Sequence, residues 1–299
     1  MYYRSLNEEL REKFGGKVYK AALDCGFTCP NRDGTIGKGG CIFCLGGSGD
    51  FVEKESGSVF EQIERAKQRV EKKNPGGKYI AYFQSYTNTY APVERLEKLF
   101  SEAVSHPDVV AVSIGTRPDC LPDEVIELLS RLNKIKPVWV ELGLQTIHEK
   151  TAEYICRGYP LSVYDDAVKR LKAKEIYVIT HAIIGLPGEN KEMAAETAEY
   201  IGKSGADGIK LQLLHVLKGT KLEHEYLEGK FDVLSMEEYI SILEECIRRL
   251  PKTMTIHRLT GDGDKRYLVA PLWSGDKKRV LNAINEAFEK DDLIQGEKL

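Results

Sequence analysis

Short apolar segments rich in β-branched residues alternate along this chain with segments whose apolar residues recur at helical spacing. Examples are VVAVSI at 109–114 and PVWVEL at 137–142. A strand with a continuous apolar run is buried on both faces, as in a parallel sheet covered by helices. The alternation predicts parallel strands over residues 18–23, 79–83, 109–114, 138–142, 176–184 and 208–214. Six strand–helix units of this kind predict an α/β fold, with the sheet closed into a partial or full barrel.

Helix boundaries are marked by local capping signals. Ser5 with Glu8, Ser58 with Glu61 and Ser235 with Glu238 fit the capping box, in which two side chains satisfy backbone groups at a helix start. Prolines 92 and 122 fit the first turns of two further helices. Other helices are predicted around residues 148–155, 162–173, 191–204 and 282–288.

In folds of this kind ligands bind at the carboxyl ends of the strands. Polar loops follow the predicted strands at 24–57, 84–89, 116–119, 143–146, 186–189 and 215–220. The first of these is long, rich in Gly and Cys, and therefore predicted to be functional. We predict one active site at these carboxyl ends of the strands, which we call the rim.

The predicted organisation has three parts. These are an N-terminal helical segment (1–17), a barrel (18–220) that contains the long loop 24–57, and a C-terminal extension (221–299) that covers the barrel and includes a last short strand at 254–256.

The overall charge is small. A net charge of −3 argues against a strongly basic nucleic-acid coat, although a local basic patch is compatible with RNA binding. The basic stretches 65–73, 169–174 and 277–279 are interpreted as solvated helix faces or as phosphate contacts. The first residues carry no apolar run, and no segment reaches the ~20 apolar residues that span a bilayer. We therefore expect a cytoplasmic protein without membrane contact, whose seven cysteines are reduced.

The cysteines gather in the long loop. Cys25, Cys29, Cys41 and Cys44 lie there, with the last two in a C-x-x-C spacing and several glycines between Cys29 and Cys41. Four thiolates suit a closed structural zinc site, whereas three suit a [4Fe–4S] cluster with one open iron. The position of the loop after the first barrel strand favours the cluster, because catalysis takes place at that end of a barrel. Cys120, Cys156 and Cys246 stand singly and are predicted to fill the core.

Several motifs resemble those of one known family. The run GFTCPNRDG–x2–G–x–GGC–x–FC resembles the cluster loop of the YhcC-like radical S-adenosylmethionine (SAM) proteins, which are related to the radical SAM domain of the Elongator catalytic subunit. The resemblance covers most of the chain and continues through FQSYTNTYAP, TRPDCLP, VELGLQT, LLHVLKGT and HRLTGDG. It implies a radical SAM partial (βα)6 barrel with a C-terminal α/β extension, a [4Fe–4S] cluster and SAM.

The resemblance also implies roles for individual residues. Cys29, Cys41 and Cys44 would ligate the cluster, and Cys25 would not be required. The SAM-binding residues implied are Gln84, Ser85, Tyr86, Thr87, Asn88, Gln145, Ile183 and Ile184. In the strand 176–184, His181 would also lie beside the adenine, whereas core packing is the alternative for the two isoleucines. The usual Gly-Gly-Glu of the second-strand loop is replaced here by polar residues.

Three residues are candidates for catalytic contact. Arg117 suits a carboxylate of SAM or of the substrate because its guanidinium is forked, with a surface ion pair as the alternative. His215 and Lys218 flank a rim loop and are assigned to the substrate or to structural roles.

Three functions remain open on the sequence. The first is a radical SAM enzyme that cleaves SAM reductively to a 5′-deoxyadenosyl radical and acts on tRNA, trimming a carboxymethylaminomethyl group on the wobble uridine to aminomethyl. The second uses the same chemistry on a small metabolite or cofactor precursor. The third is a non-catalytic zinc-stapled binding protein. The first two require an electron donor such as flavodoxin or ferredoxin.

Overall fold

The computed structural model describes residues 2–46, 57–261, 263 and 265–299. Their central feature is a sheet of seven parallel strands in the order β1-β2-β3-β4-β5-β6-β8. The strands are β1 (Val18–Leu23), β2 (Lys78–Phe83), β3 (Val109–Thr116), β4 (Val138–Gln145), β5 (Tyr177–Ile184), β6 (Gly208–Leu213) and β8 (Thr255–Arg258). A separate antiparallel pair is formed by β7 (Val216–Leu217) and β9 (Leu268–Ala270).

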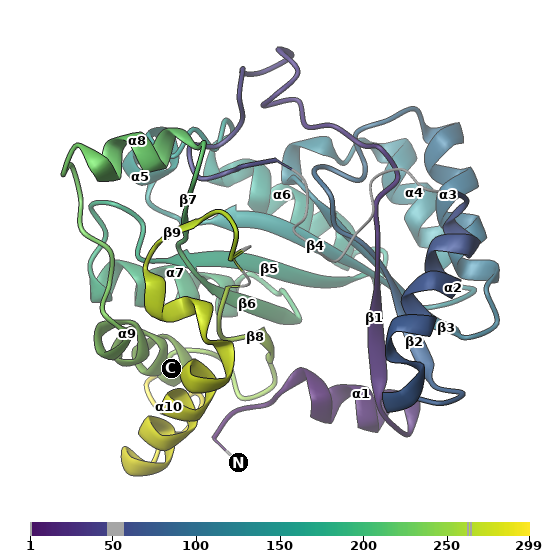
Figure 1. Ribbon diagram of the computed structural model, residues 1–299. Coiled ribbons are helices and arrows are strands. Elements are labelled where there is room, and N and C mark those ends of the chain that lie inside the picture. The colour runs from purple at the N-terminus through teal and green to yellow at the C-terminus, as the bar shows by residue number, and fades with distance from the viewer. Residues whose placement is uncertain (1, 47–56, 262, 264) are drawn as a thin grey trace.

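Helices connect the strands and lie mainly outside the sheet (Figure 1). They are α1 (Leu6–Phe14), α2 (Val59–Val70), α3 (Val93–Ser105), α4 (Asp123–Asn133), α5 (Glu149–Tyr154), α6 (Leu161–Lys172), α7 (Lys191–Lys203), α8 (Lys221–Leu227), α9 (Met236–Arg248) and α10 (Lys277–Lys290). Short 3-10 helices cover Glu71–Lys73, Pro118–Cys120 and Leu272–Gly275. In the described part of the chain, no helix combines the length and the apolar character needed to cross a membrane.

The sheet is curled into a half-barrel. Neighbouring strands lie about 4.8 Å apart, so β1 and β4 would be far apart in a flat sheet. Nevertheless Nζ of Lys20 on β1 lies 3.0 Å from Oε1 of Glu141 on β4. The Lys210 ammonium on β6 lies 3.2 Å from the Tyr82 hydroxyl on β2. Contacts across so many strands require that these side chains meet inside a concave surface, which we call the lumen.

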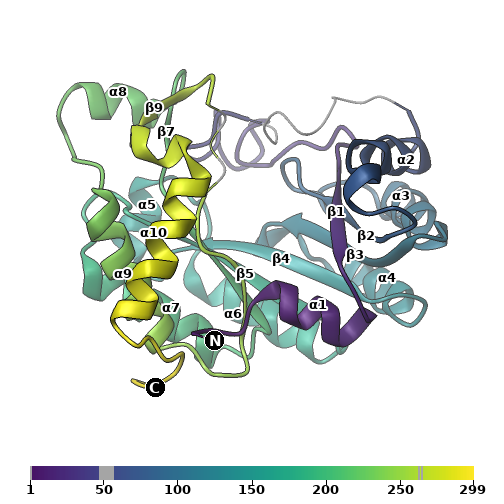
Figure 2. The ribbon, with the colours of Figure 1, turned by 60° about the horizontal axis from the view of Figure 1, so that its bottom comes forward.

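The pleat sorts the strand residues between the two faces. On the convex face, alternate residues such as Phe83, Ile114 and Leu142 pack with helices in the largest core cluster. On the concave face, Ile80, Ala111, Trp139 and Ile179 pack against Leu10 of α1. Figure 2 shows α1 lying across this end of the sheet. The amino end of the lumen is therefore closed by an apolar floor.

The fold agrees with the predicted barrel, and the six predicted barrel strands are all present. The short strand expected near 254–256 is β8, which joins the main sheet beside β6 as its seventh strand. The last helix is longer than expected, because Asp276 caps it and it begins at Lys277. Helix α8 and the β7–β9 pair were not predicted.

Candidate active site

Residues 24–46 of the cysteine loop leave the carboxyl end of β1 and cross the top of the barrel (Figure 1). Residues 47–56 of the predicted loop 24–57 lie outside the described residues. The carbonyl of Cys29 accepts hydrogen bonds from the backbone N–H groups of Arg32 and Asp33, at 2.8 and 3.1 Å. The N–H of Cys44 donates to the carbonyl of Cys41 at 2.9 Å, which closes the C-x-x-C turn. The Cys41 thiol lies within electrostatic range of both Cys44 and Cys29. The loop therefore gathers these three thiols.

Burial and the neighbouring thiols raise the pKa of Cys41 to about 12, and the charge of Arg117 opposes this rise. A buried thiol keeps its proton unless a nearby positive charge takes the place of the proton and stabilises the thiolate. A bound metal supplies such a charge and deprotonates its thiol ligands. The environment of Cys41 thus suits a metal ligand better than a free nucleophile.

Cys25 lies apart from the three. Its thiol is within electrostatic range of Asp24, Arg95 and Glu102, and the side chain packs against the main core. Burial is the first cause that raises its pKa to about 12. The structure therefore groups the loop cysteines as three and one.

The loop is fixed by side chains on its own turns. The Asn31 amide lies 3.6 Å from the Cys41 sulfur and donates to the Cys156 carbonyl at 2.6 Å. Arg32 donates to the Cys44 carbonyl at 3.1 Å. Gly40 has a φ of +87°, and a Cβ there would lie 2.9 Å from Cγ of Arg32, so glycine is required.

The segment after β2 lies beside the cysteine loop. The N–H of Thr87 donates to the Thr28 carbonyl at 3.2 Å, and Tyr86 lies under the Arg32 guanidinium. Of the predicted SAM-binding residues here, Ser85, Thr87 and Asn88 are buried, and Gln84 and Tyr86 are half-buried. The Asn88 amide donates to the Gly115 carbonyl at 2.8 Å.

Two amide oxygens at this rim are buried without a hydrogen-bond partner among the described residues. They are Oδ1 of Asn88 and Oε1 of Gln145. Gln145 ends β4 with a φ of +72°, and a Cβ on Gly143 would lie 2.9 Å from its amide nitrogen. Buried polar atoms are normally paired, so these oxygens fit acceptors for a bound ligand.

The two isoleucines of β5 point in opposite directions. Ile183 is half-buried and packs with residues above the sheet, including Ile42 of the cysteine loop. Ile184 packs in the core on the convex face. Ile183 thus lies near the rim. Ile184 lies in the core, which was the alternative to contact with the adenine.

Arg117 is held by a buried ion pair. It donates to both carboxylate oxygens of Asp119, at 2.9 and 2.7 Å, and to the carbonyl of Arg157 at 2.9 Å. Its guanidinium also lies 5.0 Å from the ring centre of Tyr159. Arg117 therefore stabilises the rim, and each of its three guanidinium nitrogens already donates a hydrogen bond. A direct contact of Arg117 with the substrate stays a prediction.

His215 and Lys218 follow β6 at the same end of the barrel. The His215 ring packs against the backbone at Gly261, where a Cβ would lie 2.4 Å from Cε1 of that ring. Lys218 is exposed on the turn before α8. The next residue, Gly219, lies against Leu45, because a Cβ there would be 3.6 Å from Cδ1 of Leu45. The turn of Lys218 thus borders the cysteine loop.

The other cysteines are distributed over the fold. Cys120 and Cys246 are both buried. Cys246 packs in the main core cluster as expected, whereas the Cys120 thiol lies at the rim, within electrostatic range of Asp119, Arg117 and Cys29. Cys156 is half-buried and packs against the apolar cluster that contains Ile42.

The structure adds a lumen network that the sequence analysis did not identify as a group. The network consists of Lys20, Tyr82, Glu141, His181 and Lys210. Of its members the sequence analysis named His181 alone, beside the adenine, and here this histidine bonds to Glu141. Glu141 accepts from Tyr82 at 2.9 Å, from His181 at 2.8 Å and from Lys20 at 3.0 Å, and it also pairs with Lys210. The available signal was a charged residue inside an otherwise apolar strand, as in KAAL, VWVEL and GIKLQL.

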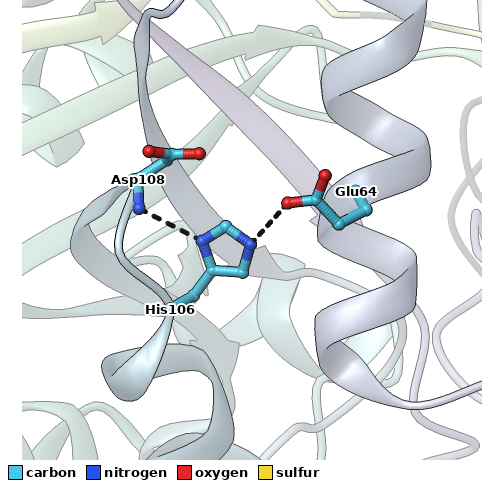
Figure 3. A group of neighbouring side chains, drawn as sticks. All are labelled: Glu64, His106 and Asp108. Atoms are coloured by element: carbon cyan, nitrogen blue, oxygen red, sulfur yellow. Dashed lines mark hydrogen bonds and ion pairs between the residues drawn. The ribbon is translucent and has the colours of Figure 1, made fainter.

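A separate polar cluster lies at the opposite end of the strands. Glu64, His106 and Asp108 bring potential ligand atoms within 4.8 Å of one another (Figure 3). However, Lys67 forms ion pairs with both carboxylates, at 2.7 Å from Glu64. A cation would have to displace this ammonium, so we interpret the cluster as a structural ion pair between α2 and the start of β3.

Comparison with known proteins places these features in a family. Residues 29–201 match the radical SAM superfamily, and residues 206–290 match a radical SAM C-terminal domain. YtqA of Bacillus subtilis, an uncharacterised protein, is 46% identical over 98% of this chain and 92% of its own length. YhcC of Escherichia coli K12 is 39% identical over 97% of this chain and 93% of its own length.

More distant relatives share parts of the chain. A tRNA uridine(34) acetyltransferase of Methanocaldococcus jannaschii is 28% identical over 57% of this chain and 31% of its own length. The structure of an archaeal Elp3 from Methanocaldococcus infernus superposes with a TM-score of 0.72 at 20% identity, over 93% of this chain and 64% of that structure. This last likeness concerns the fold.

The family implies a [4Fe–4S] cluster and SAM as cofactors. The sequence match runs from Cys29 through the barrel, and its relatives cover almost the whole chain. The chain is therefore a SAM-dependent iron–sulfur enzyme that belongs to the radical SAM superfamily, in the group that contains YtqA and YhcC.

Proposed function

We propose that Cys29, Cys41 and Cys44 hold the [4Fe–4S] cluster and that the loops after β2 and β4 bind SAM against it. The main support is that these three thiols lie together, whereas the Cys25 thiol lies near Asp24, Arg95 and Glu102. When bound, the cluster and SAM supply a reducing electron and a 5′-deoxyadenosyl radical. The residues of this chain bind, orient and shield these groups.

The alternative of a structural zinc has less support. Zn–S bonds of ~2.3 Å in a tetrahedron place thiolates ~3.8 Å apart. Among the described residues, no three of the loop cysteines bring their sulfur atoms within 4.8 Å of one another. A four-iron cluster is larger and needs ligands with wider spacing.

The unpaired amide oxygens support the SAM position. Oδ1 of Asn88 and Oε1 of Gln145 are acceptors at the rim. The methionyl end of SAM carries an ammonium group, which offers donors that these oxygens lack. Tyr86 and Thr87 hold the β2 loop beside the cysteine loop through Arg32 and Thr28. We assign Gln84–Asn88, Gln145 and Ile183 to SAM on this basis.

The cluster assignment is tested by anaerobic reconstitution of the full chain with iron and sulfide. We expect a brown protein that absorbs near 400 nm and forms 5′-deoxyadenosine with SAM and dithionite. Cys29→Ala should lose the cluster iron, whereas the matched variant Cys25→Ala should keep it. Full iron in Cys29→Ala, or a colourless zinc protein, would contradict the assignment.

For the substrate we propose tRNA, with the carboxymethylaminomethyl group of a wobble uridine trimmed to aminomethyl. Its support is the similarity to a protein named for tRNA uridine(34). The net charge of −3 adds no support. As the electron donor we propose a flavodoxin or ferredoxin.

Mass spectrometry of bulk tRNA from a strain lacking the gene tests the proposed tRNA substrate. An unchanged nucleoside profile would contradict it and favour a small metabolite.

A further inference from the structure

The lumen network stands out because it places several charges in the interior. The side chain of Glu141 is fully buried, that of Lys210 is 3% exposed, and that of Lys20 is 25% exposed. His181 is 19% exposed and lies with Nδ1 3.1 Å from the amide nitrogen of Gln212. The network is thus buried at Glu141 and Lys210 and open at Lys20 and His181.

The charges of this network do not cancel when Lys210 is protonated. In that state two ammonium groups, on Lys20 and Lys210, share the single carboxylate of Glu141. Burial holds His181 in its neutral form by lowering its pKa to about 4, and Lys210 contributes to this shift. An uncompensated charge in a low-dielectric interior is costly, which favours binding of a counter-charge.

We propose that the lumen is an oxyanion site, in which Lys20, held by Glu141, binds a carboxylate or phosphate group of the substrate. This inference rests on the proposed function, because it takes the lumen below the rim as the place of the substrate. The residues of this site are other than the rim residues that we assign to SAM.

The strand register places two glycines, which have no side chain, between this site and the rim. On β3 the inward residues after Ala111 are Ser113 and Gly115, and on β4 Glu141 is followed inward by Gly143. Gly115 pairs with Glu141 across the two strands. Because neither glycine has a side chain, nothing from these two positions stands between Glu141 and the amide of Gln145. A substrate group reaching below the rim would meet Lys20 and His181.

Binding of an anion should be coupled to protonation of Lys210. Burial first, then the charges of Lys20 and Arg258, lower its pKa to about 7, while Glu141 acts against this. Among the described residues, other polar groups near it are Tyr82, 3.2 Å away, His181 and His257. An added negative charge favours the ammonium form, so the anion should bind more weakly as the pH rises above 7.

The test is calorimetric titration of the reconstituted full chain, saturated with SAM, with acetate and separately with phosphate. We expect saturable binding of one of the two, and the preferred anion identifies the class of substrate group. Lys20→Met should weaken that binding at least tenfold, and Lys20→Arg should restore part of it. The matched control Lys17→Met removes an exposed lysine next to the same strand and should bind like the wild type.

Equal binding by wild type and Lys20→Met, or no saturable binding of either anion, would overturn the proposal. Far-ultraviolet circular dichroism and iron content show whether Lys20→Met is folded. If Lys20→Met is not folded, anion binding by the wild type and by Lys20→Arg is compared at pH 6.5 and 8.5 instead. A wild-type affinity that does not decrease between pH 6.5 and 8.5 is then the contradicting result. A wild type that forms 5′-deoxyadenosine but binds no anion refutes this inference alone. Absence of cluster and 5′-deoxyadenosine refutes the proposed function.

Discussion

Gln145 combines a left-handed backbone with a buried amide oxygen that has no partner among the described residues. Both features are costly in the free protein, since left-handed backbone is strained for a residue with a side chain and an unpaired buried acceptor loses its hydration. A ligand donor would recover the second cost. The residue is therefore expected to contribute to SAM affinity through its side chain.

We predict that Gln145→Ala weakens SAM binding about tenfold, which corresponds to about 1.4 kcal/mol and to one hydrogen bond with a charged donor. Equilibrium binding of SAM to the reconstituted protein measures the effect. The exposed Gln68→Ala is the control. Unchanged affinity in Gln145→Ala would remove this residue from the site.

His181 makes a second residue-level prediction, on acid stability. Burial, followed by the charge of Lys210, lowers its pKa to about 4 in the folded chain, against about 6.5 when unfolded. Between these values the unfolded chain binds the extra proton, so stability falls as the pH decreases from 6.5 towards 4. The contribution is at most about 3 kcal/mol.

Urea unfolding of the full chain between pH 7 and 5 tests this. We expect a shallower loss of stability in His181→Gln than in the wild type, while His224→Gln, at a side chain that is 76% exposed, keeps the wild-type slope. Parallel slopes for His181→Gln and wild type would show that this histidine titrates normally.

At the residue scale the sequence was most informative where spacing carries chemistry. The C-x-x-C of Cys41 and Cys44 was recognisable because two thiols so close in sequence can meet. The lumen network was not, because Lys20 and Glu141 lie on strands that are far apart in sequence and become neighbours only when the sheet curls. The ion pair of Arg117 with Asp119 is local, yet its burial depends on Tyr159 and the carbonyl of Arg157.

At the scale of elements, boundaries followed local capping chemistry. The three predicted capping boxes are all formed, at α1, α2 and α9. Helix α8 was missed because it is short, although its cap is also local, with the Thr220 hydroxyl accepting from the N–H of Glu223. The β7–β9 pair was missed because it joins two very short segments about fifty residues apart, which no periodicity reveals.

We predict that Ser235→Ala destabilises the protein by about 1 kcal/mol, because the Ser235 hydroxyl accepts from the Glu238 N–H at 3.1 Å at the start of α9. Thermal unfolding should show a decrease of about 2–4 °C. Ser130→Ala, in the interior of α4, serves as the comparison. Equal melting temperatures for Ser235→Ala and wild type would mean that tertiary packing alone sets the start of α9.

At the scale of the whole molecule, α1 closes the barrel floor although it precedes the first strand. Leu10 packs beneath Trp139, and the carbonyl of Arg4 accepts from the N–H of Ile256 on β8 at 2.9 Å. The capping box of α1 was visible in the sequence, but its docking under the sheet depends on long-range contacts.

We predict that deletion of residues 2–16 exposes this floor and lowers the melting temperature by more than 5 °C. Limited proteolysis should then cleave the chain near β8, which loses its backbone partner at Arg4. The double substitution Asn7→Ala and Arg11→Ala, at exposed positions of α1, is the control. An intact, equally stable deletion variant would show that the barrel closes without α1.

The two ends of the described chain are adjacent. The N–H of Arg4 donates to Oε1 of Gln295 at 2.8 Å, and the N–H of Gln295 donates to the carbonyl of Tyr2 at 3.2 Å. A short peptide linker can therefore join the termini, and new termini can be opened in the surface turn at Pro75–Gly76. Because this turn precedes β2, reporter domains fused there would lie at the end of the strands opposite Cys29, Cys41 and Cys44.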